Sequence, residues 1–261
     1  MIARYGEVFL KSDFVKKRMR KILVDNIKHD LQKNGIDASV CAGDIIRIYT
    51  NSVKKTETTL KRTFGIVSFS SVFVCKKDMD DICTTAKSLA KNFSGTFAIE
   101  AKRSDKSFPY TSQDIERIAG KAIADTGLKV NLTKPKNKIY IDVRDECHVY
   151  SNVNPGPGGL PLGSGGMAIG FSDNLLANWL MMKRGVKVVL VGKDRRNYKK
   201  LKKWNSKLSF HKINKIQDIS KIAKKQNIRA VIYDKPVKNL LSLNPLVGFS
   251  EKEIRAMKRL I

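Results

Sequence analysis

Cysteine is scarce in this chain of 261 residues, and the four that occur are scattered along it. They are Cys41, Cys75, Cys83 and Cys147. No two of them form a C-x-x-C pair, and the three histidines, His29, His148 and His211, are isolated from one another. A structural zinc site needs about four Cys or His ligands at close spacing. We therefore expect no metal and reduced thiols rather than a disulfide framework.

Long apolar runs are also absent. No stretch approaches the about 20 apolar residues that a transmembrane helix needs, and no apolar run follows a charged N-terminal segment as in a secretory signal. We expect a cytoplasmic protein on these grounds. The hydrophobic fraction of 42% is enough to bury real cores, and 261 residues fit two or three compact domains.

Acidic residues are few, with 24 Asp and Glu against 51 Lys and Arg. The formal net charge is +27 and the pI is near 10.0. Self-repulsion on this scale opposes the compact state, so a polyanionic partner is the natural explanation. Nucleic acid is the first candidate partner and an anionic membrane surface the second. A role in solubility, or the lysine preference of a thermophile, is the alternative explanation.

The first region is predicted to have the element order β-α-β-β-α of a ferredoxin-like sandwich. A capping residue at Ser12 or Asp13 opens a helix whose outer face is basic. The predicted elements are a strand at 4–11, a helix from there to near Gly35, strands at 38–41 and 45–49, and a helix at 52–63.

The second region is predicted to be a mixed sheet with two helices, since its strands require both parallel and antiparallel pairing. Asp78 or Asp80 caps the first helix, and Thr111 or Ser112 caps the second. The predicted elements are a strand at 65–74, a helix at 79–91, a strand at 97–101, a helix ending at 125, and strands at 130–132, 139–143 and 147–153.

A stretch rich in Gly and Pro, residues 154–166, marks a boundary. Beyond it, apolar strands alternate with helices, which is typical of a parallel sheet covered on both faces. We expect three or four strands there. The predicted elements are helices at 174–184, 198–207, 216–226 and 250–260, with strands at 186–191 and 228–233 and a further short one near 208–210.

The segment at 97–120 combines a strand, a basic turn and a helix. Lys102, Arg103 and Lys106 cluster in the turn, next to the N-terminus of the helix. Helix N-termini and guanidinium groups both favour phosphate oxygens. Phe108 either packs in the core, which is the favoured interpretation, or stacks on a base. An ordinary basic βα turn is the alternative to a phosphate-binding site.

The sequence of this turn, K-R-x-D-K-x-F-P-x-T-S, resembles the THUMP domain, an RNA-binding module of tRNA-modifying enzymes. The resemblance covers nearly the whole chain, because the strand RYGEVFLK, the linker GGLPLG, the helix end LMMKRG and the segment NPLVGFSEKEI are similar to those of the 4-thiouridine tRNA sulfurtransferases. It implies an α/β protein with an α+β N-terminal half. The implied domains are a ferredoxin-like domain at 1–62, a THUMP domain with its linker at 63–165, and a short parallel α/β domain of nucleotide-binding type at 166–261.

In that family the third domain binds ATP through a pyrophosphatase (PP) loop, S-G-G-x-D-S, and a cysteine persulfide delivers sulfur. The corresponding loop here is residues 169–174, which keeps Gly170 and Asp173 but has Phe171 in place of the second glycine and Asn174 in place of the last serine. We expect its first strand to be trimmed. No cysteine follows Cys147 in this sequence, and sulfur transfer through a thiolate needs a thiol.

The resemblance and these departures predict a tRNA-binding protein that grips the acceptor stem and 3′ end with its first two domains and has lost ATP-dependent thiolation. Phosphate contacts are expected from Lys11, Lys16, Lys17, Arg20, Lys102, Arg103 and Lys106. The basic helix with Lys199, Lys200, Lys202 and Lys203, beside Trp204, either extends this surface or is only a solvated helix face.

The alternative is an active thiolation enzyme that uses an external sulfur donor or a separate partner enzyme. It would bind ATP with Mg²⁺ at Gly170, Asp173 and Asn174, the degenerate nucleotide-binding residues. No catalytic residue is identified, and no cofactor is certain unless this alternative holds.

Overall fold

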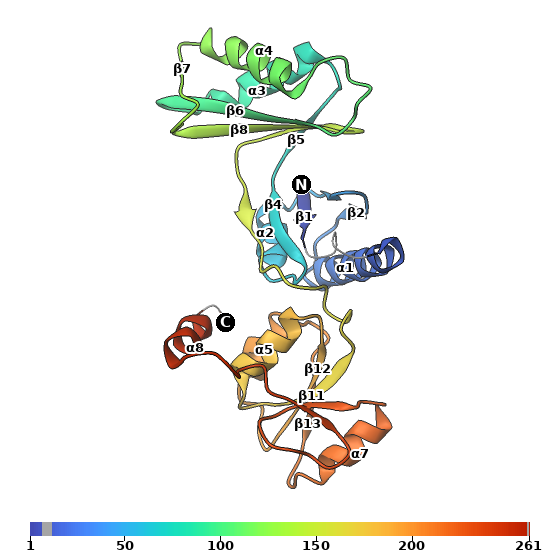
Figure 1. The fold of residues 1–261 in the computed structure, drawn as a ribbon. Helices are drawn as coiled ribbons and strands as arrows, with labels where there is room; N and C mark the ends of the chain where they lie inside the picture. Colours follow the sequence, from blue (N-terminus) through green and yellow to red (C-terminus); the bar gives the residue numbers. More distant parts are fainter. Residues whose placement is uncertain (7–11, 260) are drawn as a thin grey trace. The chain divides into compact units, whose positions relative to one another are not determined.

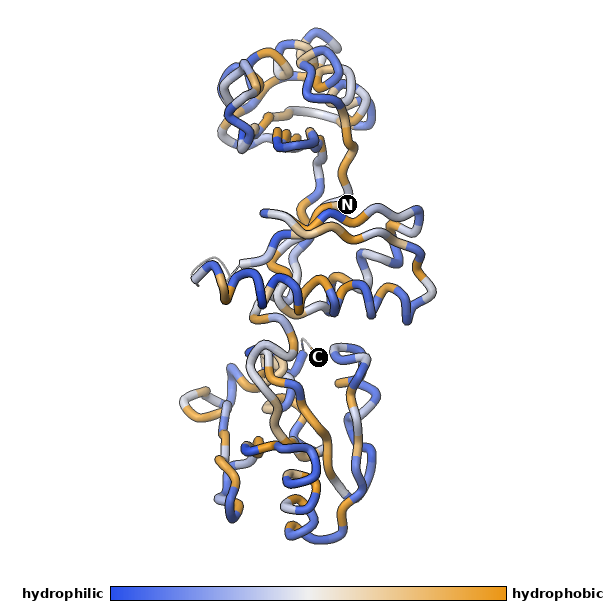
Figure 2. The backbone as a smooth tube through the Cα atoms, turned by 90° about the vertical axis from the view of Figure 1, so that its right-hand side faces the viewer, coloured by the Kyte–Doolittle hydropathy of each residue, from blue (hydrophilic) through white to orange (hydrophobic). Residues whose placement is uncertain are grey.

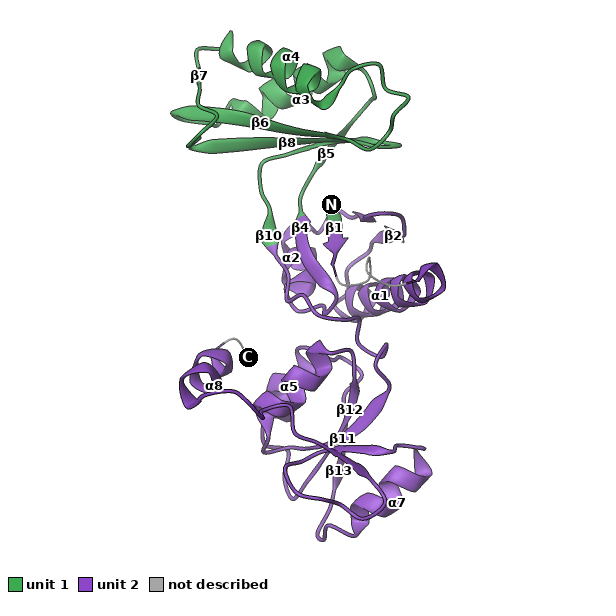
Figure 3. Ribbon diagram, in the orientation of Figure 1, with its two compact units in different colours: residues 1–2, 70–154 green, residues 3–69, 155–261 purple. Residues whose placement is uncertain are grey.

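The computed structural model describes residues 1–6, 12–259 and 261, whose strands form three five-stranded sheets (Figure 1). Two compact units are distinguished by their internal contacts (Figure 3). The first unit comprises residues 1–2 and 70–154, and the second comprises residues 3–69 and 155–261. No helix in the described part of the chain is long and apolar enough to cross a membrane.

The N-terminal sheet of the second unit has the strand order β10-β4-β1-β3-β2. Its strands are β1 (Ile2–Tyr5), β2 (Ser39–Cys41), β3 (Ile46–Tyr49), β4 (Ile66–Ser70) and β10 (Asn154–Pro155), and its helices are α1 (Asp13–Lys33) and α2 (Val53–Leu60). Hydrophobic residues alternate with hydrophilic ones along α1 (Figure 2), and those at helical spacing are buried, Leu23, Val24, Ile27 and Leu31. Gly35, with φ +64°, ends this helix as predicted.

The strand predicted at 65–74 is two strands, which belong to different sheets. β4 lies in the N-terminal sheet, whereas β5 (Phe73–Cys75) lies in the sheet of the first unit. The strand predicted at 147–153 is likewise shorter, because β9 ends at Tyr150 and the chain then pairs with β4. Gly156 permits this pairing, since a Cβ there would lie 2.3 Å from the Ile66 carbonyl oxygen.

The sheet of the first unit has the order β5-β9-β8-β6-β7, with α3 and α4 packed on one face (Figure 1). Pairing is mixed as predicted, because β6 runs parallel to β7 and β8 whereas β9 is antiparallel to β8 and β5. The elements are α3 (Met79–Ala90), β6 (Thr96–Arg103), α4 (Ser112–Ala124), β7 (Lys129–Val130), β8 (Asn137–Val143) and β9 (Cys147–Tyr150).

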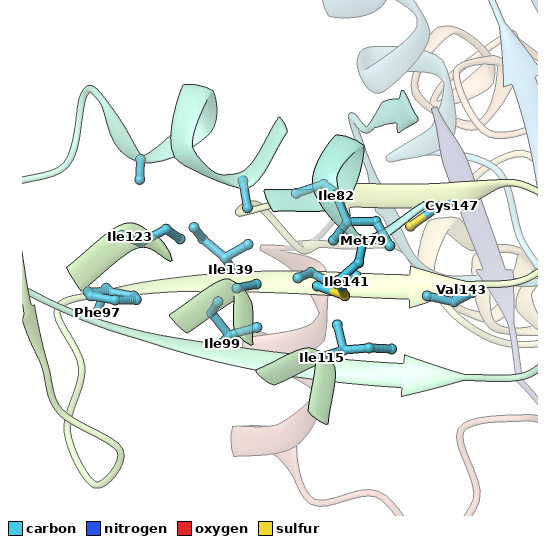
Figure 4. Packing of buried hydrophobic residues seen from close by; sticks show 14 of the residues in the cluster. Met79, Ile82, Phe97, Ile99, Ile115, Ile123, Ile139, Ile141, Val143 and Cys147 are labelled. Atoms are coloured by element: carbon cyan, nitrogen blue, oxygen red, sulfur yellow. The ribbon is translucent and has the colours of Figure 1, made fainter. Parts of the chain in front are cut away.

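The core of this unit lies between the sheet and the two helices (Figure 4). Asp78 caps α3 by accepting from two backbone N–H groups, and Thr111 forms a capping box with Asp114 at the start of α4. Both helices therefore begin at one of the two residues expected from the sequence. The cap at Thr111 fixes where the segment between β6 and α4 ends.

The third sheet is entirely parallel, with the order β13-β12-β11-β14-β15. It has five strands rather than three or four, and the first strand is not trimmed: β11 is central and five residues long. The elements are β11 (Met167–Phe171), α5 (Leu175–Lys183), β12 (Lys187–Gly192), α6 (Tyr198–Lys202), β13 (Ser209–Lys212), α7 (Asp218–Lys225), β14 (Ala230–Ile232), β15 (Leu241–Leu243) and α8 (Glu251–Lys258).

The Gly/Pro-rich linker packs against the C-terminal end of α5. The N–H of Leu160 donates to the Lys183 carbonyl oxygen at 2.9 Å, and those of Gly163 and Gly165 donate to that of Gly185 at 2.7 and 3.0 Å. The last carbonyls of a helix have no partner within it, so the linker serves as the cap of α5.

Candidate functional site

A basic loop, defined here as residues 102–108, begins with the last two residues of β6 and leads to the segment before α4. Lys102 and Lys106 are exposed, and Arg103 is partly buried. Neither lysine makes an ion pair within the described ranges. These positions therefore present positive charge that the rest of the described structure does not neutralise.

Arg103 also shapes the basic loop. Its Nη1 donates to the carbonyl oxygen of Phe108 at 3.0 Å, and its backbone N–H donates to Ser112 Oγ at 3.2 Å. A guanidinium carries five N–H donors in a planar fork, so this bond leaves donors for a ligand. This second, positioning role could not be predicted from the sequence.

Asp105 is the one acidic residue of the basic loop, and its charge is taken up by Lys77. Its Oδ2 accepts from Lys77 Nζ at 2.5 Å, and its Oδ1 accepts from the N–H and Oγ of Ser107 at 2.9 and 2.7 Å. The hydrogen bond from Lys77, then those from Ser107, hold the pKa of Asp105 well below its usual range. This carboxylate therefore holds the turn rather than pairing with the basic-loop cations.

Phe108 is buried, with 5% of its surface exposed, and belongs to the core of the first unit. The structure thus matches core packing and not base stacking, because the ring is already enclosed by apolar side chains. Tyr110, whose ring centroid lies 5.6 Å from that of Phe108, is 37% exposed and is the accessible aromatic residue next to the basic loop.

The basic residues of α1 lie in the second unit. Lys17 is exposed, whereas Lys16 pairs with Asp13 at 3.2 Å. Arg20 Nη1 donates to the Gly43 carbonyl oxygen at 3.1 Å, so this guanidinium also anchors the turn between β2 and β3. Lys11 falls outside the described residues.

A groove of about 470 Å³ in the second unit was not predicted. Five cations line it: Lys33, Lys55, Arg62, Lys202 and Lys203. Asp30 is its one acidic lining residue, and Asp30 Oδ1 accepts from Ser206 Oγ at 2.5 Å. None of the five cations forms an ion pair with another described residue. The groove could not be predicted from the sequence, because its lining residues come from three segments that are far apart in the chain.

Trp204, which follows the basic helix α6, is partly buried and packs against the core. Its ring lies 5.2 Å from that of Phe64 in a stacked arrangement and 5.4 Å from that of Trp179 at a steep angle. Lys202 and Lys203 line the groove described above, called here the cationic groove, whereas Lys199 and Lys200 lie exposed on α6.

The degenerate nucleotide loop lies at the topological switch point of the parallel sheet, between β11 and β14, where ligands of such sheets bind. β11 ends at Phe171, and the ring of Phe171 lies 4.5 Å from that of Tyr233, which follows β14. The two rings thus contact each other at these neighbouring strand ends. A large ring also stands where a glycine would let backbone approach a phosphate.

Gly170 has no room for a side chain, because its neighbour Asn178 lies close to it. A Cβ at Gly170 would lie 1.9 Å from Asn178 Oδ1. Asn178 is fully buried, and its Nδ2 donates to the Phe171 carbonyl oxygen at 2.7 Å. Asp173 is exposed, and Asn174 is the N-cap residue of α5 but makes no side-chain capping hydrogen bond.

A polar pocket of about 370 Å³ lies beside this loop, at the carboxyl ends of β11, β12 and β13. Lys193, Arg196 and Lys215 line it together with Asp173 and Asp194. Arg196 Nη2 lies 3.3 Å from Asp194 Oδ2, which offsets part of the positive charge. The described residues contain no group of acidic, His or Cys side chains that would hold a metal ion.

Comparisons with known proteins identify the family. Residues 1–70 match the ThiI ferredoxin-like domain, and residues 76–152 match the THUMP domain. The chain is 35% identical over 202 residues to a probable tRNA sulfurtransferase of Caldanaerobacter subterraneus, an alignment that covers 73% of this chain and 52% of the relative. The chain belongs to the ThiI family of tRNA sulfurtransferases.

A second ThiI-family relative, the probable tRNA sulfurtransferase of Methanocaldococcus jannaschii, is 32% identical over 253 residues, covering 90% of this chain and 63% of the relative. The chain thus spans between about half and two thirds of the length of these two relatives.

Two solved structures share the fold. The crystal structure of PH1313 from Pyrococcus horikoshii matches with a TM-score of 0.86 and 28% identity, covering 99% of this chain and 97% of that one. A 4-thiouridine synthetase in complex with RNA and ATP matches with a TM-score of 0.78 and 21% identity, covering 99% and 84%.

Proposed function

We propose that this ThiI-family chain binds tRNA at the acceptor stem and 3′ end, and that it no longer thiolates uridine with ATP. The observation that carries the first part is the basic loop, whose cations lie next to the N-terminus of α4 while its one carboxylate is neutralised by Lys77. Such a surface neutralises phosphates and reads the shape of an RNA end rather than its sequence.

The binding region comprises residues 1–62 and 63–165, which are the ferredoxin-like and THUMP domains of the proposed division. The exposed cations of α1, among them Lys17, add to it. The cationic groove provides a further phosphate-binding surface, because its five uncompensated cations repel one another unless an anion lies between them.

The third domain, residues 166–261, serves as a scaffold in this proposal. The Phe171 and Tyr233 rings contact each other at the strand ends where a nucleotide would bind, and residues 166–261 contain no cysteine. Aromatic contacts of this kind contribute roughly 0.5–1.5 kcal/mol beyond area burial, so a nucleotide would have to displace a stable arrangement.

A salt titration of the affinities for a tRNA transcript, duplex DNA and anionic vesicles tests the binding proposal. Phosphate contacts with RNA predict tightest binding to tRNA, with log K falling by roughly 0.7–0.9 per phosphate contact for each unit of log salt. Equal affinity for anionic vesicles would instead identify a general polyanion binder. Equilibrium dialysis with ATP tests the second part, for which we expect no micromolar binding.

One observation favours the alternative, an active enzyme that takes sulfur from an external donor or a separate partner enzyme. The polar pocket of about 370 Å³ beside Asp173 offers Lys193, Arg196 and Lys215 to a polyphosphate. If the alternative is correct, the wild-type chain binds ATP with Mg²⁺ at micromolar concentrations, and Asp173→Ala abolishes this binding. Analysis of 4-thiouridine in tRNA from cells with and without the protein then separates an enzyme from a binding protein.

A further inference from the structure

Two of the four free cysteines meet across neighbouring strands of the first unit. Cys75 on β5 and Cys147 on β9 are directly opposite each other in the antiparallel register. Both side chains belong to the core between sheet and helices, where Cys147 is fully buried and Cys75 is partly buried. Figure 4 shows Cys147 at the end of this core nearest Val143.

Their register places them within the range of a disulfide. Directly opposite residues of an antiparallel pair have Cα atoms about 4.5–5.5 Å apart, and a disulfide requires about 4.4–6.8 Å. The thiols are also in hydrogen-bond contact with each other. The two residues lie far apart in the sequence, so only the strand register reveals the pair.

The two thiols have different chemical characters. The hydrogen bond from Cys147 lowers the pKa of Cys75, whereas the same hydrogen bond and burial raise the pKa of Cys147. Cys75 is therefore the more readily ionised thiol, and it is also the more exposed of the two. Because thiolates are the reactive species, Cys75 is the thiol that reacts first. Cys147 lies beside it as a neutral resolving thiol.

We propose that Cys75 and Cys147 form a site of reversible oxidation, which closes a disulfide between β5 and β9 when the protein meets a hydroperoxide. The Cys75 thiolate attacks the peroxide oxygen and becomes a sulfenic acid, and the leaving hydroxide takes up a proton to form water. The Cys147 sulfur then attacks the Cys75 sulfur, which forms the S–S bond and expels the sulfenic oxygen as a second water. Two thiols are oxidised by two electrons, and one hydrogen peroxide is reduced.

The site lies in one cross-strand row with the basic loop. Arg103 is opposite Val143, Val143 is opposite Cys147, and Cys147 is opposite Cys75. Two residues beyond Cys75, Lys77 holds Asp105 of the basic loop. Oxidation would thus fasten the edge strand from which that ion pair extends.

The test treats the folded, full-length chain with hydrogen peroxide, quenches it, and then alkylates the denatured protein. We expect the intact mass to fall by two hydrogen atoms and the alkylated cysteines to fall from four to two, with peptide mapping that joins Cys75 to Cys147. A dithiol should restore all four. Four alkylated cysteines after treatment, or Cys75 over-oxidised without a cross-link, would overturn the proposal.

Three variants complete the experiment. Cys75→Ser should abolish the cross-link, and its partly exposed position makes the fold tolerant of the change. Cys83→Ser is the matched control, because Cys83 is also partly buried and packs against the same core. Cys41→Ser is the second control, from an exposed position of β2. Loss of the cross-link in either control would assign the pairing to another cysteine and overturn the proposal.

Discussion

Gly170 and Asn178 share one small space, since a Cβ at position 170 would lie 1.9 Å from Asn178 Oδ1. In the ThiI-family interpretation a glycine at this point serves a phosphate. Here it serves the contact between β11 and α5, where Asn178 Nδ2 holds the Phe171 carbonyl oxygen. The contact with Asn178 is therefore enough by itself to require glycine at this position.

Gly170→Ala is expected to destabilise the third domain by about 1–3 kcal/mol, the usual cost of overpacking a buried site. Urea unfolding measures this change. Gly120→Ala is the matched control, because nothing lies within 4 Å of a Cβ at that helical position. It should stabilise by about 0.5–1 kcal/mol through helix propensity. Equal effects of the two substitutions would show that Asn178 does not limit position 170.

Lys102→Ala combined with Lys106→Ala is expected to weaken tRNA binding and to reduce the salt slope by about 1.4–1.8 if each lysine contacts one phosphate. These two lysines are chosen over Arg103 because Arg103 also holds the Phe108 carbonyl oxygen, whereas the lysines make no ion pair in the described structure, so the fold should be unaffected. Fluorescence anisotropy with a labelled transcript measures the effect. The control is Lys221→Ala with Lys224→Ala, two exposed positions of α7.

Lys55→Glu with Arg62→Glu tests the cationic groove in the same assay. Reversing two of its five cations should lower tRNA affinity at least tenfold at low salt, since each change replaces attraction for phosphate by repulsion. Lys221→Glu with Lys224→Glu changes the net charge equally on α7. A similar loss in both variants would mean that net charge, and not the groove, determines the binding.

Acid should weaken the turn of the basic loop through Asp105. The folded-state pKa of Asp105 is depressed by Lys77 and Ser107, so the stability that its ionised carboxylate contributes is fully present above the unfolded pKa of about 3.9. It is lost as the pH falls through the folded value. Urea unfolding at several pH values below about 4 should therefore show a weaker pH dependence for Asp105→Asn than for the wild type. Lys77→Met should change this dependence in the same direction, and an unchanged dependence in both would contradict the assignment.

Much of the fold follows from local patterns. Three helices start where the sequence offers a capping side chain, at Asp78, Thr111 and Ser250, because each of these side chains accepts a hydrogen bond from a nearby backbone N–H. The apolar strands of the third region correctly predicted a parallel sheet. The division of residues 65–74 between two sheets could not be predicted, because the alternation of side chains is continuous and says nothing about which partner strand is paired.

The site was predictable only where charges are neighbours in sequence. Lys102, Arg103 and Lys106 lie within five consecutive residues and were identified, whereas the cationic groove is assembled from separate segments and was not. Phe108 shows the remaining ambiguity, since an aromatic residue beside basic ones has the same local signature whether its ring faces the core or the solvent. Burial decides it, and burial depends on long-range packing.

The linker contacts have a consequence for how the chain is made. Leu160 bonds the last residue of α5, and Gly163 and Gly165 bond Gly185 just beyond it, although the ribosome synthesises this helix only after them. The linker therefore leaves the ribosome before α5 does, and its hydrogen bonds to Lys183 and Gly185 can form only when α5 is complete. Nascent chains halted before Gly185 should accordingly leave the linker open to protease, and those extended well beyond it should protect it.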